Sequence, residues 1–358
     1  MKILFLLPYP LKEAPSQRFR LEQYLEILSN RGHHYEVQSF LNSQARILFP
    51  KPGGIGRKVG ALLTGYGKRF LILFKLAPFH FIFIHREAAP LGPPLFEWFV
   101  ANVLQKKIIY DFDDAIWMTD KQTENRLEKI IRWRGKVKSI CRWSYKVSCG
   151  NHFLCQFASA FNSHVILNPT TIDTLHLHRR EDYPNVKKSN AITLGWTGSY
   201  STVKYLRLLE PVLKHLERKY PLLQFLVIAD REPDFPLSSL IYRPWSTASE
   251  IQDLMVVDIG IMPLPDDEWS KGKCGFKALQ YMALQIPTVA SRVGVNAEII
   301  TDHVNGFLCS SEQEWIEKLE LLINDRAVRE RVGKQGRNTV EINYSVVSNT
   351  SNFLSLFE

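Results

Sequence analysis

The chain has 358 residues, of which 45% are hydrophobic and 23% are charged. This composition is that of a globular protein with material for about two domains, and it excludes a disordered chain. The five cysteines form no Cys-x-x-Cys pair and no regular spacing, which argues against a disulfide framework or a zinc site and fits a reducing compartment.

The net charge of +9 is divided unevenly along the chain. Residues 1–180 contain 26 Lys and Arg against 13 Asp and Glu, a balance of +13, whereas residues 181–358 contain 19 against 23, a balance of −4. A basic first half favours an anionic partner or surface, such as the headgroups of a membrane. Nucleic acid is not expected as a partner, because no nucleic-acid module is recognised and aromatic residues do not alternate with the basic ones.

The first half alternates short apolar runs with longer amphipathic ones, which is the pattern of parallel βαβ units. Strands are predicted at residues 2–7, 35–39, 79–85 and 107–112, and helices at 18–30, 56–76, 93–105 and 126–147. The opening apolar run is ended by Pro8 and is shorter than a secretory h-region, so a cytoplasmic location is expected. No stretch is long and apolar enough to predict a span through a bilayer.

A polar stretch without periodicity, residues 171–190, is predicted to be a linker. Strands at 192–197, 224–228, 259–262 and 288–291 then alternate with helices at 202–220, 249–256, 276–284 and 312–324. The predicted fold is therefore α/β, with two Rossmann-like, doubly wound domains at residues 1–170 and 191–344 that face each other across a cleft. A last helix, residues 345–358, is predicted to pack back on the first domain.

Five pieces of the sequence follow one another at characteristic spacings: 168–173, 195–204, 273–291, 293–300 and 305–308. Together they resemble the landmarks of family 4 glycosyltransferases, also called glycosyl transferases group 1. The resemblance implies the GT-B fold, a nucleoside-diphosphate sugar as donor, a hydroxyl acceptor, retention of configuration, and no metal or other cofactor. A glycan or lipid-linked acceptor is expected, in capsule, lipopolysaccharide or exopolysaccharide assembly. A nucleotide-sugar epimerase of the same fold is an alternative.

A diphosphate cradle is predicted where Lys273, Gly275 and Lys277 open a helix. Backbone N–H groups and the helix dipole suit an anion there, and glycine lets the backbone approach it closely. Lys204, on a helix that follows Gly198, is expected to reach the same anion, and Lys277 is expected to act on the charge that develops on the leaving diphosphate. Each lysine is alternatively an ordinary solvated residue of its helix.

The cradle departs from the family pattern, which has two Glu residues separated by seven others. Those positions hold Gly272 and Gln280 here, and Gln280 is expected to bind a ribose hydroxyl. Ser199 stands where the family usually has Arg, and Glu298 matches a family Glu near the donor, although an acidic residue at a helix start is also ordinary. The missing pair leaves a non-catalytic sugar-nucleotide binding protein as a further alternative.

Three carboxylates, Asp111, Asp113 and Asp114, lie at the end of a predicted strand. An Asp-x-Asp pair can clamp Mg²⁺ or Mn²⁺, but the fold that uses this clamp has one Rossmann-like domain and this chain has two. By resemblance, Asp113 and Asp114 fall on a pair beside the donor sugar. We therefore expect Asp113 to orient sugar hydroxyls or offset positive charge, with Asp114 as its support and no metal; a purely structural role is the alternative.

Basic residues also follow predicted strands in the first half. Arg18 and Arg20 open a helix and suit an anionic group, unless Ser16 caps that helix and both arginines are exposed. His85 is expected to contact the acceptor, or to be structural. Residues 56–76 mix basic and large apolar residues, so the segment is predicted either to lie peripherally on the inner face of the cytoplasmic membrane or to be a core helix.

Overall fold

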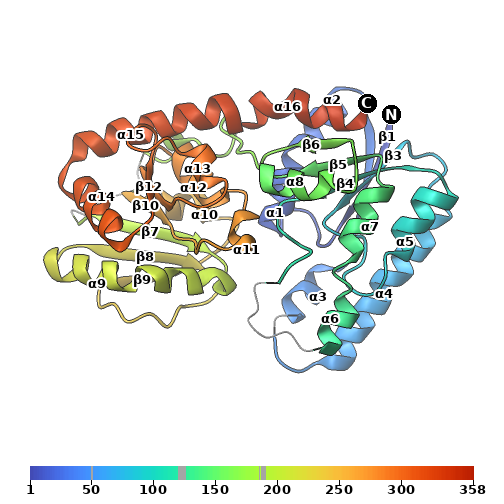
Figure 1. The fold of residues 1–358 in the computed structure, drawn as a ribbon, viewed down its shortest axis with the longest axis horizontal. Helices are drawn as coiled ribbons and strands as arrows, with labels where there is room; N and C mark the ends of the chain where they lie inside the picture. The colour runs from blue at the N-terminus through green and yellow to red at the C-terminus, as the bar shows by residue number, and fades with distance from the viewer. Residues whose placement is uncertain (50, 120–125, 185, 187–190) are drawn as a thin grey trace. The chain divides into compact units, whose positions relative to one another are not determined.

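The computed structural model describes residues 1–49, 51–119, 126–184, 186 and 191–358. Its internal contacts divide the chain into unit 1, Met1–Thr170 with Thr350–Glu358, and unit 2, Thr171–Asn349 (Figure 1). Within the described residues, each unit contains a six-stranded parallel sheet covered by helices. This architecture confirms the predicted α/β fold of two doubly wound units.

The sheet of unit 1 has the strand order β2-β1-β3-β4-β5-β6, and every neighbouring pair is parallel. The strands are β1 (Lys2–Leu7), β2 (His34–Ser39), β3 (Phe81–His85), β4 (Lys107–Phe112), β5 (Lys146–Cys149) and β6 (Val165–Leu167). Helices on both faces of a sheet select near-continuous apolar strands, and all residues of β3 are buried. The apolar runs predicted near β1 to β4 are therefore confirmed as strands.

Three helices predicted in unit 1 are divided in the structure, and the one at 93–105 becomes α5 (Leu95–Trp98) and η2 (Phe99–Val103). The first becomes α1 (Pro15–Arg20), η1 (Glu22–Tyr24) and α2 (Leu25–Asn30). The helix predicted at 126–147 becomes α6 (Arg126–Arg132) and α7 (Lys136–Trp143), and its last residues belong to β5. The prediction was wrong there because pairing of β5 with β4 and β6, which is non-local, decides the conformation of that segment.

The remaining helices of unit 1 surround its sheet (Figure 1). They are α3 (Ser43–Leu48), α4 (Ile55–Leu73), α5 (Leu95–Trp98), the π-helical η2 (Phe99–Val103) and α8 (His152–Ser159). The chain end joins this unit through α16 (Val346–Leu354), from Thr350 on, and η6 (Ser355–Phe357). Phe353 stacks on Tyr24 with ring centroids 4.2 Å apart, so the last residues complete the aromatic core of unit 1.

Unit 2 has the strand order β12-β11-β10-β7-β8-β9. The strands are β7 (Thr193–Gly198), β8 (Gln224–Ala229), β9 (Leu240–Pro244), β10 (Ile259–Met262), β11 (Thr288–Ser291) and β12 (Phe307–Cys309). The helices and helical turns are η3 (Arg180–Asp182), η4 (Tyr200–Leu209), α9 (Glu210–Lys219), α10 (Glu250–Leu254), α11 (Glu268–Lys271), α12 (Phe276–Ala283), α13 (Asn296–Ile299), α14 (Glu312–Asn324), α15 (Arg326–Thr339) and η5 (Val340–Tyr344).

The stretch predicted to be a linker opens unit 2. Thr171 and Ile172 are buried, and Ile172 forms a β-bridge with Ser345 of the same unit. Residues 185 and 187–190 of the predicted linker lie outside the described residues.

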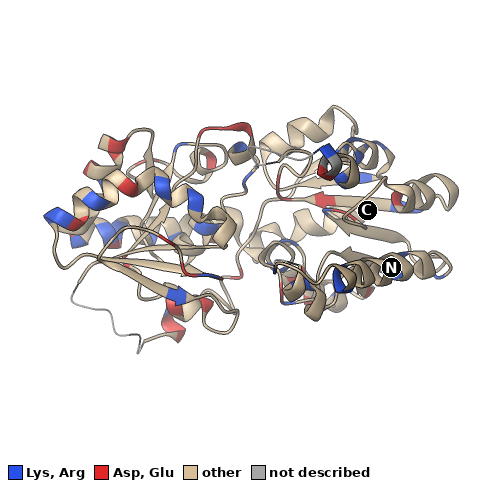
Figure 2. Ribbon diagram, turned by 90° about the horizontal axis from the view of Figure 1, so that it is seen from below, with Lys and Arg blue, Asp and Glu red and all other residues tan. Residues whose placement is uncertain are grey.

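Single helices differ in charge. In unit 2, acidic residues predominate on α14 and basic residues on α15, whereas α4 of unit 1 has basic residues and no acidic one. Figure 2 shows basic and acidic residues on the helices of both units. Of the helices in the described part of the chain, none is both long enough and apolar enough to cross a membrane.

Candidate functional site

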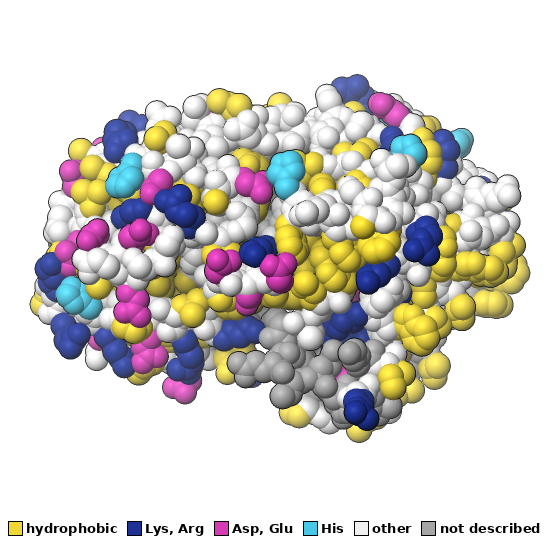
Figure 3. All heavy atoms as spheres, in the orientation of Figure 1, with side chains coloured by type: hydrophobic (Ala, Val, Ile, Leu, Met, Phe, Trp, Pro, Cys, Tyr) yellow, Lys and Arg dark blue, Asp and Glu magenta, His cyan; other side chains and the backbone are white. Residues whose placement is uncertain are grey.

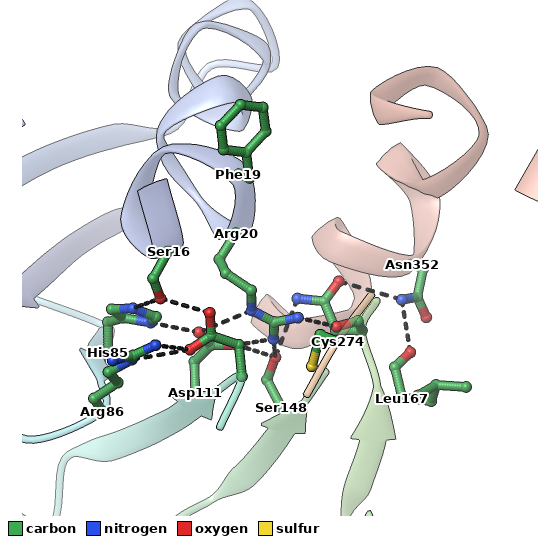
Figure 4. A network of polar contacts seen from close by, with 12 residues as sticks. Ser16, Phe19, Arg20, His85, Arg86, Asp111, Ser148, Leu167, Cys274 and Asn352 are labelled. Carbon is green, nitrogen blue, oxygen red and sulfur yellow. Dashed lines mark hydrogen bonds and ion pairs between the residues drawn. The ribbon is translucent and has the colours of Figure 1, made fainter. Parts of the chain in front are cut away.

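A polar cluster lies at the carboxyl ends of the strands of unit 1, where parallel sheets commonly bind ligands (Figure 4). We call it the unit 1 cluster. Its members come from α1 and from the ends of β3, β4, β5 and β6: Ser16, Arg20, His85, Arg86, Asp111, Asp113, Asp114, Ser148 and Asn168. The parallel register places these segments at one edge, although they are far apart in sequence.

The buried half of the cluster is organised around Asp111. His85 Nδ1 lies 2.7 Å from Asp111 Oδ2, Ser148 Oγ donates to Oδ1 at 2.6 Å, and Arg20 Nε donates to Oδ2 at 3.3 Å. Burial alone would raise the pKa of Asp111, but the Arg20 charge and the His85 hydrogen bond hold this pKa below its ordinary value. Asp111 is thus an ionised carboxylate whose oxygens are both engaged by protein groups.

Arg20 corrects one expectation from the sequence. It was predicted to meet an anionic ligand, but it is buried and pairs with Asp111 through Nη2. It also donates to the Asn168 carbonyl oxygen and, at 3.2 Å, to Ser148 Oγ. A buried guanidinium requires such partners, so Arg20 holds the sheet edge together.

Asp113 and Asp114 form the more exposed half of the cluster, with side chains 12% and 18% exposed. Arg86 Nε donates to Asp113 Oδ1 at 2.9 Å, and Ser16 Oγ donates to Asp113 Oδ2 at 2.6 Å. Arg86 Nη2 also lies 3.3 Å from Asp114 Oδ2. Burial would raise the pKa of Asp113, but the charges of Arg86 and His85 hold it far below its ordinary value. Asp113 is therefore a weak base that suits the binding of hydroxyls or of positive charge.

Arg86 has a backbone conformation that non-glycine residues seldom adopt, with φ of +62° directly after β3. Its N–H donates to the Asp111 carbonyl oxygen at 2.7 Å, which fixes the turn. Backbone strain of about 1–3 kcal/mol is kept where the surrounding structure requires it, often at functional sites. The turn brings the guanidinium to Asp113 and Asp114.

Ser16 was considered as a helix cap, but Ala14 is the N-cap of α1 and offers no side-chain cap. Ser16 instead lies in the first turn and contacts His85 Nε2 at 2.8 Å. His85 was predicted to contact the acceptor, yet its ring is buried and both its nitrogens are engaged. Arg18 is half-buried, with its guanidinium 5.1 Å from the centre of the Phe19 ring.

The predicted diphosphate cradle in unit 2 lies at the start of α12. Gly275 is the N-cap residue, with φ of +68° and no side-chain cap. A Cβ at this position would lie 2.3 Å from Ile299 Cδ1, so both conformation and space require glycine. A helix start with glycine at the N-cap lets an anion approach the backbone N–H groups closely.

Lys277 and Gly198, predicted to serve one ligand, are brought into contact by the structure. A Cβ on Gly198 would lie 2.8 Å from Lys277 Cε. The Lys277 ammonium lies 5.4 Å from the centre of the Trp196 ring, at the end of β7. Lys273 is half-buried and lies 4.7 Å from the centre of the Trp269 ring. Two of the predicted lysines therefore flank the start of α12.

The other predicted residues of unit 2 differ in accessibility. Gln280 is only 4% exposed, whereas Ser199, Lys204 and Glu298 are exposed. Ser199 is the N-cap residue of η4, a 3₁₀ helix that replaces the first half of the helix predicted at 202–220. Burial, followed by the charge of Glu298, raises the pKa of Tyr344.

Among the described residues, no three His, Cys, Asp or Glu side chains are grouped so as to hold a metal ion. Both oxygens of Asp111 already accept hydrogen bonds from protein groups, so an Asp111–Asp113 metal clamp would have to displace Arg20, His85 or Ser148.

Comparison with known proteins extends these observations. Residues 268–339 match the family described as Glycosyl transferases group 1. A sequence comparison with curated proteins finds no match. Among solved structures, a sucrose-phosphate synthase from Thermosynechococcus elongatus superposes with a TM-score of 0.70 at 13% identity, covering 99% of this chain and 97% of that chain.

Two further structures have the same fold. A glycosyltransferase from Rickettsia africae gives a TM-score of 0.67 at 15% identity, with 99% and 97% of the two chains covered. Anabaena HepE in complex with UDP-glucose gives a TM-score of 0.66 at 13% identity, with 99% of this chain and 98% of that chain covered. The chain therefore has the GT-B glycosyltransferase fold, and residues 268–339 of unit 2 carry the signature of the glycosyl transferases group 1.

Proposed function

We propose that this protein is a glycosyltransferase that moves a sugar from a nucleoside diphosphate to a hydroxyl acceptor with retention of configuration. The observation that carries the proposal is the start of α12 inside the matched segment, where Gly275 is an N-cap without a side chain and Lys277 packs against Gly198. HepE, which shares the fold, binds UDP-glucose, so UDP-sugars are the first donors to test.

Unit 2 would hold the nucleotide sugar. The backbone at Gly275 and the ammonium groups of Lys273 and Lys277 would offset the charge that grows on the leaving diphosphate, and Lys204 would bind the same anion. Ser199 and Glu298 are exposed and would contact the nucleotide sugar. Gln280 would reach a ribose hydroxyl only after its buried amide becomes accessible.

Unit 1 would bind the acceptor and act on the sugar. Asp113, ionised and held by Arg86 and Ser16, would accept hydrogen bonds from sugar hydroxyls and stabilise developing positive charge. Asp114 would support it through Arg86, and Arg18 would contact the acceptor. We propose that lysines and helix N–H groups replace a metal in this reaction.

A membrane-bound acceptor is supported by α4. One face of this helix packs on the rest of unit 1, and the opposite face exposes large apolar side chains, with Ile55 76%, Leu63 66% and Phe70 61% exposed. In the orientation of Figure 1, hydrophobic side chains also gather over the α4 and α5 side of unit 1 (Figure 3). Unit 1 contains 24 Lys and Arg against 13 Asp and Glu.

Apolar side chains beside basic ones suit peripheral binding to the anionic inner face of a cytoplasmic membrane, where a lipid-linked glycan precursor would be the acceptor. Arg57, Lys58 and Lys68 are the basic residues of α4 that we assign to this surface. Arg69 does not belong to it, since it is buried and donates to the Ala88 carbonyl oxygen at 2.8 Å.

The absent carboxylates at Gly272 and Gln280 favour one rival, a protein that binds a sugar nucleotide without catalysis. The purified chain should first be screened by thermal shift against nucleotide sugars, because a ligand that binds only the folded state raises its stability. Transfer from the donors that bind is then measured with hydroxyl acceptors, and the products are analysed. Binding without turnover would support the non-catalytic rival. Formation of an epimerised nucleotide sugar would identify the protein as an epimerase instead of a transferase.

A further inference from the structure

We propose that His85 carries a proton on both ring nitrogens and, through Ser16, positions Asp113 for the transfer proposed above. His85 lies at the end of β3, buried between Asp111 on one side of its ring and Ser16 on the other (Figure 4). The proposal rests on the proposed function for its role in the reaction, but the protonation of His85 is a separate, directly measurable statement.

The protons can be assigned from the hydrogen-bond partners. Asp111 pairs with Arg20 and Asp113 with Arg86, and a carboxylate in an ion pair only accepts hydrogen bonds. His85 Nδ1, 2.7 Å from Asp111 Oδ2, must therefore carry a proton. Ser16 has one proton, and it points to Asp113 Oδ2 at 2.6 Å. The Ser16 oxygen then faces His85 Nε2 at 2.8 Å as an acceptor, so Nε2 must carry a second proton.

Either neutral tautomer leaves one contact unsatisfied. A bare Nδ1 would face the carboxylate of Asp111, and a bare Nε2 would compete with Asp113 for the single Ser16 proton. With His85 as a cation, the charges of the cluster balance: Arg20, His85 and Arg86 against Asp111, Asp113 and Asp114. Glu22 of η1 is a further carboxylate whose charge interacts with that of His85.

The order Ser16–His85–Asp111 is that of a serine nucleophile with its base and orienting carboxylate. The cluster differs in one respect, because Ser16 also faces the second carboxylate, Asp113. A doubly protonated His85 cannot accept the Ser16 proton, so the arrangement does not activate Ser16 as a nucleophile. It fixes the direction of the Ser16 hydroxyl.

This direction matters for Asp113. Arg86 holds Oδ1 at 2.9 Å and Ser16 holds Oδ2, so the carboxylate plane is set before a ligand binds. When His85 loses a proton, Ser16 becomes able to donate to Nε2 instead, and Asp113 Oδ2 loses the Ser16 hydrogen bond. His85 is thus a positioning residue, and the transfer should weaken as the pH rises through its deprotonation.

The protonation itself is tested by NMR on the full chain labelled with ¹⁵N-histidine. The resonances of His85 are identified by their loss in His85→Asn, and by their shift in Ser16→Ala if that variant alone remains folded. At neutral pH we expect both ring nitrogens to have the shifts and attached-proton signals of an imidazolium. A neutral tautomer, with one protonated nitrogen, would overturn the proposal whether or not the protein is a transferase.

The positioning role is tested by the pH dependence of kcat. The wild type should lose activity with one deprotonation on the alkaline side, whereas Ser16→Ala should have about tenfold lower kcat, an unchanged donor KM and no such limb. Ser16→Thr, which keeps the hydroxyl, should restore the limb. The control Ser148→Ala removes a hydroxyl from the buried half of the same cluster and should keep the limb.

Two outcomes would contradict different parts of the argument. An alkaline limb that persists unchanged in Ser16→Ala would refute the role of Ser16. Absence of any transfer by the wild type would refute the proposed function while leaving the NMR result intact.

Discussion

Gly198 and Lys277 meet at the start of α12: a Cβ on Gly198 would lie 2.8 Å from Lys277 Cε and 2.6 Å from Trp196 Cη2. Trp196 is 1% exposed, so its ring is enclosed by other residues. The end of β7 and the first turn of α12 therefore pack closely because position 198 has no side chain.

Gly198→Ala should displace Lys277 and weaken binding of UDP by about tenfold or more, the loss of roughly one charge-assisted hydrogen bond. Calorimetric titration with UDP measures this. Gly67→Ala is the matched control, because a Cβ at Gly67 meets no atom within 4 Å. Equal UDP affinity in the two variants would contradict the assignment of this contact to the nucleotide site.

Lys277→Ala should weaken nucleoside-diphosphate binding by about 10- to 100-fold, because it removes an ammonium group that would bind the diphosphate. The unfolding temperature should stay nearly unchanged. Lys214→Ala, on the exposed side of α9, should change neither quantity. Unchanged binding in Lys277→Ala by calorimetry would remove Lys277 from the site.

Transfer should persist in excess EDTA, because lysines and backbone N–H groups would supply the positive charge at the diphosphate. Rates with and without chelator, followed by addition of Mn²⁺ or Mg²⁺, test this expectation. Complete loss of transfer that Mn²⁺ restores would assign Asp111 and Asp113 to a metal site instead.

Asp111 should make the unfolding free energy depend on acid pH. Its pKa is lower in the folded chain than the ordinary 3.8, so its stabilisation is complete above that value and is lost as the pH falls through the folded pKa. Asp111→Asn should cost about 3–5 kcal/mol at pH 7, because it leaves Arg20 buried without its counterion. Urea unfolding at neutral and acid pH measures both effects.

Glu181→Gln is the control for that experiment. The pKa of Glu181 is also lowered, by backbone and Arg179 hydrogen bonds, but its side chain is 60% exposed and its ion pair is screened by solvent. We expect Glu181→Gln to change the unfolding free energy by no more than about 0.5 kcal/mol. If Asp111→Asn lowered the unfolding free energy no more than this control does, the Arg20–Asp111 pair would not be important for stability.

The α4 surface should bind vesicles that contain anionic lipid, bind neutral vesicles weakly, and release the anionic vesicles in high salt. Replacing Arg57, Lys58 and Lys68 with Gln should reduce co-sedimentation strongly, since each basic residue near such a surface contributes about 1 kcal/mol. The same change at Lys214, Arg218 and Lys219 of α9 is the control. Equal binding to neutral and anionic vesicles, or to neither, would show that the charge serves another ligand.

The sequence by itself determined the features that are local. Buried parallel strands are continuous apolar runs, so β1, β3 and β4 could be located from residue order. The start of α12 could also be found, because a glycine between basic residues before a helix is visible in the sequence.

Only the tertiary structure decided which charged residues are buried. Arg18 and Arg20 are alike in sequence, but Arg20 is buried because Asp111, 91 positions away, arrives beside it when β4 joins the sheet. Ser16 and Arg86 became part of the cluster in the same way, since His85 and Asp113 reach them only across the sheet edge. Burial of an ion pair depends on its partner, and strand pairing, which is non-local, brings the partner.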